Sequence, residues 1–271
     1  MNVPQPRTIP ERTTRCVCRT AFSPAFTLVE LLLVIAVIAV LMALLVPAFT
    51  NLGRAGDITK ATYDLSGALQ AARSYATSND TYVWVGFYEE DGSQSSKNPS
   101  VPGTGRIIIT TVASKDGTNI FSTGTMAAQP FQLSNLVKIN NMHLKTATTG
   151  DPVFTLPTGT PAPVSTGPAF DTRPSVSGTV AQIGDTTPSA IAAAYQLLYP
   201  VGSTTATAQY TFGKVLQFNP RGEASLNNSA LTPVLEIGLQ STHGSVTDTV
   251  NRNVAAVQIT GIGGNVTIYR R

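Results

Sequence analysis

The sequence has few of the residues that most catalytic and redox sites use. Of its 271 residues, two are cysteine, two are histidine and one is tryptophan, and 12% are charged. Both cysteines, Cys16 and Cys18, lie near the N-terminus, so the rest of the chain can form neither a disulfide nor a cysteine metal site. His143 and His243 have no spacing typical of a metal site or a catalytic triad. We therefore expect a protein that is not an enzyme, with no catalytic residue, no cofactor and no metal.

The chain also lacks a net charge outside its N-terminal stretch. The first 25 residues hold four of the 18 basic residues and one of the 15 acidic ones, so the remainder is neutral. This balance gives no overall electrostatic reason to bind nucleic acid. A local patch stays an alternative, with Arg270 and Arg271 as candidate phosphate contacts. It requires five arginines to converge on one face, namely Arg73, Arg221, Arg252, Arg270 and Arg271.

What the chain does have is a long uncharged run. The 22 glycines and 18 prolines, with much threonine and serine, are typical of exported, loop-rich β proteins. No charge occurs in Leu31–Gly53, which at about 1.5 Å per residue can cross a hydrocarbon layer of roughly 30 Å. Arginines precede this run, so the positive-inside tendency places residues 1–25 in the cytoplasm and the bulk of the chain outside it. We expect a single-pass protein of the inner (cytoplasmic) membrane.

Two simple interpretations of this run are a cleaved secretory signal and an uncleaved anchor. The first would use the basic N-terminal stretch, the apolar run and the small residues around Val46-Pro47-Ala48. Both leave Glu30 unexplained. An ionised carboxylate inside a bilayer costs on the order of a few kcal/mol unless it finds a partner.

The residues around Glu30 carry a resemblance. Ala25 followed by Phe26-Thr-Leu-Val-Glu-Leu resembles the processing site of type IV prepilins and type II secretion pseudopilins, with alanine where the family usually has glycine. The resemblance implies that a prepilin peptidase/methyltransferase cuts between Ala25 and Phe26, removes the leader 1–25 and methylates Phe26. It also implies that Glu30 is the subunit-assembly residue, and that Pro47 is the proline that kinks the helix in many members.

Such a cut would explain the carboxylate. It creates a cationic amine one helical turn before Glu30, which belongs near an anion. Within one helix, Glu30 is favourable at the positive N-terminal end of the dipole. Between subunits, it can pair with a neighbour's terminal amine, so docking in one register removes the cost of the isolated charge.

A second resemblance concerns the rest of the chain. Leu69–Val83, Phe218–Gly222 and Gly264–Arg270 are similar to segments of the H-type minor pseudopilins and the T-type fimbrial minor pilins. It implies a minor subunit that assembles through its N-terminal helix into a type II secretion pseudopilus or a type IV pilus-like filament. The implied partners are other pilin or pseudopilin subunits and the inner-membrane assembly machinery. The alternatives are a DNA-binding minor pilin of an uptake system and an uncleaved membrane-anchored β-domain protein.

Periodicity predicts the fold. Apolar residues at helical spacing from Ile58 to Ala76 predict an amphipathic helix that ends near Ser78-Asn79-Asp80, with kinks or melted points at Pro47, Gly53 and Gly56. We expect an α+β, pilin-like fold in which a long N-terminal helix, residues 26–80, is transmembrane and then amphipathic and packs on an antiparallel β domain, residues 81–271. Strands are predicted at 82–88, 106–112, 132–139, 210–218, 234–239, 254–260 and 265–269.

Several segments between the strands are also interpreted. The Thr/Pro-rich insertion 146–189 is expected to be a mobile loop, with a partner-recognition loop on the sheet as the alternative. Residues 190–198 favour a short helix. Glu89-Glu90-Asp91-Gly92 is expected to be the turn after a strand, and Arg221-Gly222 and Gly261–Gly264 are expected to be hairpin turns.

Overall fold

The structure of the chain is a computed structural model. It describes residues 27–121, 130–148, 151, 153–154, 170–174, 181–186, 189–192, 195–227, 230–249 and 253–271, without the side chains of residues 44–55 and 172. The leader 1–25 and the expected cleavage site Ala25–Phe26 lie outside these residues. The chain divides into two units, Met1–Ala48 and Phe49–Arg271.

The one α-helix of the described chain is α1, Leu28–Ser78. Its assignment is unbroken through Pro47, Gly53 and Gly56, so melting at these positions is not observed. In the second unit its buried face consists of Ile58, Ala61, Leu65, Leu69, Ala72 and Ala76. The helix ends where Asp80 takes a φ of 49° and the Thr81 N–H donates to the Ala76 carbonyl at 3.1 Å. This left-handed residue and long backward bond are typical of a helix C-cap.

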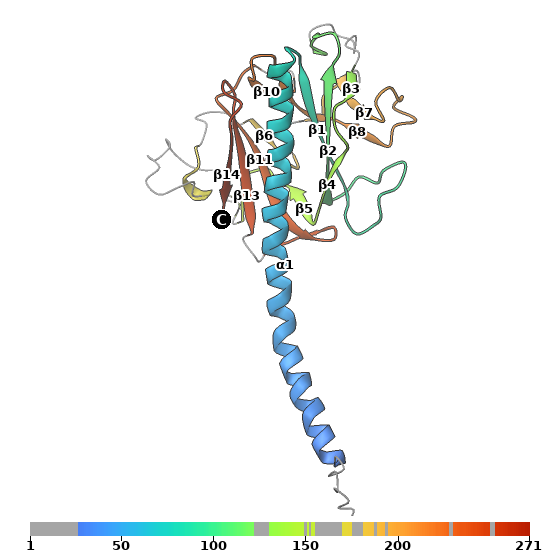
Figure 1. Cartoon of the computed structure of the whole chain (residues 1–271), viewed down its shortest axis with the longest axis vertical. Helices are drawn as coiled ribbons and strands as arrows, with labels where there is room; N and C mark the ends of the chain where they lie inside the picture. Colours follow the sequence, from blue (N-terminus) through green and yellow to red (C-terminus); the bar gives the residue numbers. More distant parts are fainter. Residues whose placement is uncertain are drawn as a thin grey trace, which may run out of the picture. The chain divides into compact units, whose positions relative to one another are not determined.

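The described strands form two larger sheets in the second unit (Figure 1). The first sheet has the order β10-β9-β1-β2-β3, and β4 also pairs with β2. All its pairs are antiparallel, with β1 at the centre. Its strands are β1 (Val83–Asp91), β2 (Gly105–Ser114), β3 (Pro130–Gln132), β4 (Val137–Asn140), β9 (Lys214–Phe218) and β10 (Ala224–Leu226).

The second sheet is centred on β11. Its order is β12-β11-β13-β14, and β11 pairs also with β5 and β6. The β6–β11 pair is parallel, with Ala181 opposite Leu235. The strands are β5 (Met142–Leu144), β6 (Ala181–Ile183), β11 (Val234–His243), β12 (Val246–Thr247), β13 (Val254–Thr260) and β14 (Val266–Arg270). A separate hairpin pairs β7 (Leu197–Tyr199) with β8 (Tyr210–Phe212), and η1 is a 3-10 turn at Phe170–Thr172.

The main core lies between the second-unit part of α1 and the inner faces of both sheets. It joins helix residues such as Leu65 and Leu69 to Val85 of β1 and Ile237 of β11. In Figure 1 the helix runs in front of both sheets, which lie on either side of it. The outer face of the first sheet carries an aromatic cluster around Trp84 that includes residues of β7 and β8. The outer face of the second sheet is covered by Phe154 and Phe170.

The expected fold class is wrong in its proportion of helix to strand. The chain is mostly β, with 38% strand against 22% helix, and its sheets are not purely antiparallel. The excess arises because strands of three residues, such as β5, β6 and β7, form in segments too short or too polar to show a strand period. No helix among the described residues combines the length and apolarity needed to cross a membrane.

Three local interpretations are also corrected. Residues 190–198 are not a helix where they are described, because Leu197–Tyr199 pairs with β8, and this pairing outweighs helix propensity. Glu89, Glu90 and Asp91 are the last residues of β1, rather than a turn. The described parts of the insertion are docked on the second sheet: β6 pairs with β11, and the Gln182 side chain bonds both the N–H and the carbonyl of Ala147.

Candidate functional site

The N-terminus of α1 is built around Glu30. The backbone N–H and the hydroxyl of Thr27 both donate to Glu30 Oε2, at 3.0 Å and 2.9 Å. In return, the Glu30 N–H donates to Thr27 Oγ1 at 3.2 Å. This reciprocal pattern is a capping box, which satisfies N–H groups that a helix start would otherwise leave without partners. The sequence signal, Thr27-x-x-Glu30, was present and was missed.

The turns that follow Glu30 expose apolar side chains on every side. Leu28 is 78% exposed and Leu41 is 52% exposed, and all described residues from Thr27 to Ala43 belong to the exposed class. Soluble monomers rarely leave a contiguous apolar surface of this kind unpartnered. Glu30 is the one charged residue between Thr27 and Ala43. A carboxylate thus stands alone on an apolar surface that is available to a partner.

The other predicted residues of this region are only partly described. Ala25 and Phe26 lie outside the described residues, and so does the side chain of Pro47.

The C-terminal arginines make contacts within the second unit. Arg270 Nη1 donates to Thr59 Oγ1 on α1 at 2.7 Å. Arg271 Nη2 lies 3.7 Å from Asp171 Oδ1, and its guanidinium stands 5.8 Å from the ring centre of Phe170. Both side chains thus serve to hold the end of β14 against neighbouring segments.

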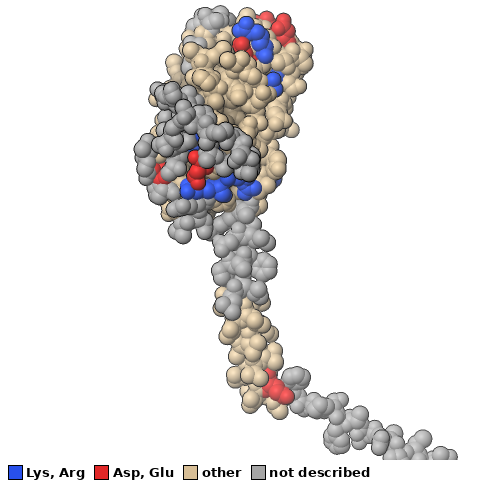
Figure 2. All heavy atoms as spheres, turned by 90° about the vertical axis from the view of Figure 1, so that its left-hand side faces the viewer, with Lys and Arg blue, Asp and Glu red and all other residues tan. Residues whose placement is uncertain are grey.

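The arginines required for a nucleic-acid face do not converge. Arg73 packs against the Gly222 turn, whereas Arg270 reaches Thr59, fourteen residues earlier on α1, or about 21 Å along its axis. Arg221 is engaged by Glu223 at 3.0 Å, and Arg252 lies outside the described residues. Figure 2 shows the Lys and Arg side chains of one face mainly in two groups at opposite ends of the globular unit, each with acidic side chains nearby.

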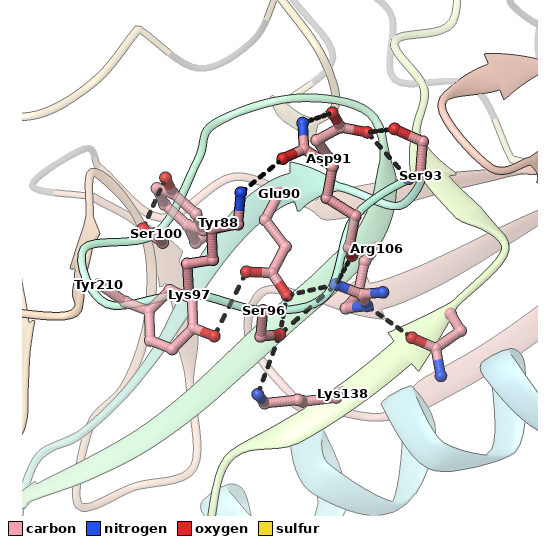
Figure 3. Close-up of polar contacts among 12 residues, drawn as sticks. Tyr88, Glu90, Asp91, Ser93, Ser96, Lys97, Ser100, Arg106, Lys138 and Tyr210 are labelled. Atoms are coloured by element: carbon pink, nitrogen blue, oxygen red, sulfur yellow. Dashed lines mark hydrogen bonds and ion pairs between the residues drawn. The ribbon is translucent and has the colours of Figure 1, made fainter.

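Glu90 is the centre of a polar network at the end of β1 (Figure 3). It is 2% exposed, and its Oε1 accepts from Arg106 Nη1 at 2.9 Å and from the Ser96 hydroxyl. Tyr210 donates to Oε2 at 3.3 Å, and Lys138 donates to Ser96 at 3.2 Å. These contacts fasten residues 92–104 over the end of the sheet. Every described group is used, so the network is structural rather than a free binding site.

A second acidic group surrounds His143. Its Nδ1 lies 2.8 Å from Glu89 Oε1, and its Nε2 lies 3.6 Å from Asp185 Oδ2. Lys214 donates to the Asp185 carbonyl at 3.0 Å. Together they line a pocket of about 410 Å³ whose apolar walls include Phe87 and Leu144. These polar contacts join distant segments of the chain.

Two pKa values in this pocket are perturbed. Burial lowers the pKa of Lys214, against the opposing effect of the Asp185 and Glu89 carboxylates. Burial raises the pKa of Asp185, but hydrogen bonds from the Thr146 side chain and backbone outweigh it, and the net shift is downward. The lowered pKa of Asp185 favours its ionised form, and the nearby Lys214 ammonium is held by the Asp185 backbone carbonyl. In the part of the chain that the structure describes, the His143 ring contacts the carboxylates of Glu89 and Asp185.

Among the described residues, the most deeply buried ion pair comes from the insertion. Arg173 Nε lies 2.7 Å from Glu236 Oε2 of β11, with 0% and 1% of the two side chains exposed. Gln258 donates to the same carboxylate oxygen at 2.7 Å, and the guanidinium stacks 4.2 Å from the Phe170 ring centre. The one arginine of the insertion was visible in the sequence, but its buried partner 63 residues later was not.

Searches for metal centres and for relatives add no assignment. No group of three or more His, Cys, Asp or Glu in the described part of the chain could hold a metal ion. Comparison of the chain with protein-family models, with curated proteins and with solved structures found no match. Function therefore has to be argued from the residues and their geometry.

Proposed function

We propose that this chain is a minor pseudopilin or pilin-like subunit. It assembles through the N-terminal part of α1 into a type II secretion pseudopilus or a type IV pilus-like filament. The observation that supports this proposal is Glu30, a lone carboxylate on an otherwise apolar and exposed helix surface. A prepilin peptidase/methyltransferase would process the chain at the inner membrane, and the assembly machinery there would join it to other pilin subunits.

Hydrophobic burial favours such an assembly. Full burial of one Leu, Ile or Val side chain is worth about 1.5–3 kcal/mol. The large apolar residues that are exposed in the described part of the first unit are Leu28, Val29, Leu31, Leu32, Leu33, Val34, Ile35, Val37, Ile38, Val40, Leu41 and Met42. Packing against neighbouring helices removes much of this surface from water. Apolar contact alone does not fix the axial register of neighbouring helices, whereas a charge pair between Glu30 and a neighbour's amine would fix it.

Glu30 also has a local role that competes with this explanation. In the capping box its carboxylate accepts both hydrogen bonds from Thr27. Loss of a cap costs about 1 kcal/mol of helix stability. The two roles differ in chemistry, because glutamine can complete a capping box and cannot form an ion pair.

Three variants separate the two roles. Glu30→Gln keeps the cap and removes the charge, Thr27→Ala removes the cap and keeps the charge, and Glu30→Ala removes both. The measurement is recovery of partner pilins with the tagged full chain from native membranes. We expect Glu30→Gln and Glu30→Ala to lose co-assembly alike, and Thr27→Ala to retain most of it. Wild-type recovery by Glu30→Gln would limit Glu30 to capping and refute the assembly role.

Processing is tested by intact mass and N-terminal peptide mapping of the protein from native membranes. A chain that begins at N-methylated Phe26 supports the proposal, and Ala25→Trp should block that cut. A chain that begins at Met1 or at Phe49 would contradict it, because an uncleaved anchor or an ordinary secreted protein produces those ends.

A further inference from the structure

A polar pocket lies between the last turns of α1 and the β13–β14 turn. It encloses about 480 Å³ and is lined by Gln70, Arg73, Ser74, Thr77, Gly264 and Asn265. All these residues belong to the second unit. The pocket is separate from Glu30 and from the His143 cluster.

Arg73 has unused hydrogen-bonding capacity in this pocket. Its Nη1 makes one long contact, 3.4 Å to Asn265 Oδ1, and its Nε is buried with no hydrogen-bond partner among the described residues. Arg106, Arg173, Arg221 and Arg271 each have a carboxylate within 4 Å. The described chain provides none for Arg73. A cationic side chain with so few acceptors is unfavourable, and a bound anion that reaches the guanidinium would reduce this cost.

Two backbone turns hold the guanidinium in place. Gly222 and Gly264 have φ values of +79° and +61°, in the left-handed region that favours glycine. A Cβ on Gly264 would lie 2.8 Å from Arg73 Cδ and Nε, so the turn passes directly against the side chain. The position of the charge is therefore set before any ligand arrives, which lowers the entropic cost of binding.

We propose that this pocket binds a carboxylate group. The guanidinium donates to the carboxylate oxygens, and Asn265, which also lines the pocket, supplies an amide N–H as a second donor. Ser74 brings a hydroxyl to the same pocket. The single positive charge of Arg73 matches the single negative charge of a carboxylate. The nearby C-terminal end of α1 carries partial negative charge, which repels a phosphate dianion more strongly than a singly charged carboxylate. This inference does not rest on the proposed filament function.

The test uses the full chain in detergent and follows the Arg73 Nε–H resonance by ¹⁵N NMR during titration with sodium acetate, at ionic strength held constant with sodium chloride. We expect a saturable shift. By isothermal titration, Arg73→Gln should bind acetate at least about tenfold more weakly, since a charge-assisted hydrogen bond is worth about 1.5–3 kcal/mol. Arg221→Gln is the matched control: Arg221 is exposed and already paired with Glu223, so acetate binding should be unchanged.

Two further variants keep the result interpretable. Arg73→Lys retains the charge, so it should fold and bind with intermediate affinity. Asn265→Ala should weaken binding without removing the arginine. A response that does not saturate, equal binding by wild type and Arg73→Gln, or tighter binding of phosphate than of acetate would overturn the proposal.

The source of the carboxylate is distinguished by sedimentation of the same samples. If acetate dissociates oligomers of the wild type and not those of Arg73→Gln, the natural ligand is an acidic side chain of a second copy. If acetate binds and leaves the oligomer distribution unchanged, the ligand is a small organic acid. Both results uphold the carboxylate site, and neither depends on whether Glu30 supports co-assembly.

Discussion

The Arg173–Glu236 ion pair allows a quantitative test of how the insertion is held. Arg173→Met preserves an unbranched side chain that can still pack against Phe154 and Phe170, but it leaves Glu236 buried at 1% exposure without its guanidinium. Gln258 still donates to Glu236 Oε2, so the carboxylate keeps one hydrogen-bond partner. Breaking a buried pair in this way costs about 3–5 kcal/mol. That is a large fraction of the stability of a typical domain.

The assay is urea denaturation of the full chain in detergent, followed by the fluorescence of Trp84. This is the single tryptophan of the sequence, and its indole N–H donates to Gln217 Oε1 at 2.9 Å inside the first sheet. Arg173 lies on the second sheet. We expect the urea concentration at the unfolding midpoint to fall by the equivalent of about 3–5 kcal/mol, with little change in the dependence of the unfolding free energy on urea. Trp84 should report this loss because both sheets share one core with α1.

Two controls complete the measurement. Arg221→Met breaks an exposed pair and should cost no more than about 1 kcal/mol. Arg173→Met combined with Glu236→Met removes both charges, and it should recover most of the loss, since apolar replacements of buried pairs are often neutral. A single variant within about 1 kcal/mol of wild type, or a double variant as unstable as the single, would refute the argument that an uncompensated charge is the cause.

The remaining predictions concern two glycines and the acid limb of stability. A Cβ on Gly238 would lie 2.0 Å from the Lys145 carbonyl oxygen, so Gly238→Ala should destabilise by about 1–3 kcal/mol in the same urea assay. Gly67 has nothing within 4 Å, so Gly67→Ala in α1 should stabilise by about 0.5–1 kcal/mol, and a stabilised Gly238→Ala would contradict the close approach. Hydrogen bonds from Thr118 and Ser114 lower the pKa of Asp116 from 3.8 to about 2. Because the pKa of Asp116 is lower in the folded than in the unfolded state, the ionised carboxylate stabilises the fold. This stabilisation is complete above pH 3.8 and is lost as the pH falls towards 2. The urea midpoint should fall as the pH is lowered over that range, and the fall should be smaller in Asp116→Asn. If the variant shows the same pH dependence as the wild type, Asp116 does not contribute to the acid loss of stability.

Local signals in the sequence predicted local structure well. The run 254–260 coincides with β13, and the turn residues at Gly222 and Gly264 stand at hairpin ends, where φ is positive. Such features depend on a few adjacent residues and on the strand period of two. Longer runs were less exact: 210–218 is divided into β8 and β9 at Gly213, where a Cβ would lie 2.9 Å from Ala190 Cβ.

Features that depend on distant partners were not predicted. Glu90 looks like a turn residue until Arg106 and Ser96 are placed beside it, and Arg173 looks like a solvated charge until Glu236 is known to face it. β6 has only three residues, which is too short to show the alternation of a strand, so its pairing with β11 could not be predicted from the sequence. Of the candidate site, Glu30 could be found from its place in an apolar run, whereas the Arg73 pocket needed the approach of two turns from other parts of the chain.

The central position of β11 has a consequence for the order in which the protein can fold. β11 pairs with β5 and β6, which lie far earlier in the chain, and β9 joins β1 in the first sheet only after the insertion has been passed. A ribosome must therefore release the chain through β10 before the first sheet has all its described strands, and through β14 before the second sheet has all of its own. Folding should be slow relative to a helical protein of this length, because many long loops close before their contacts form. A nascent chain that stops before residue 234 lacks the strand on which the second sheet is built, and its apolar faces stay exposed to chaperones and proteases.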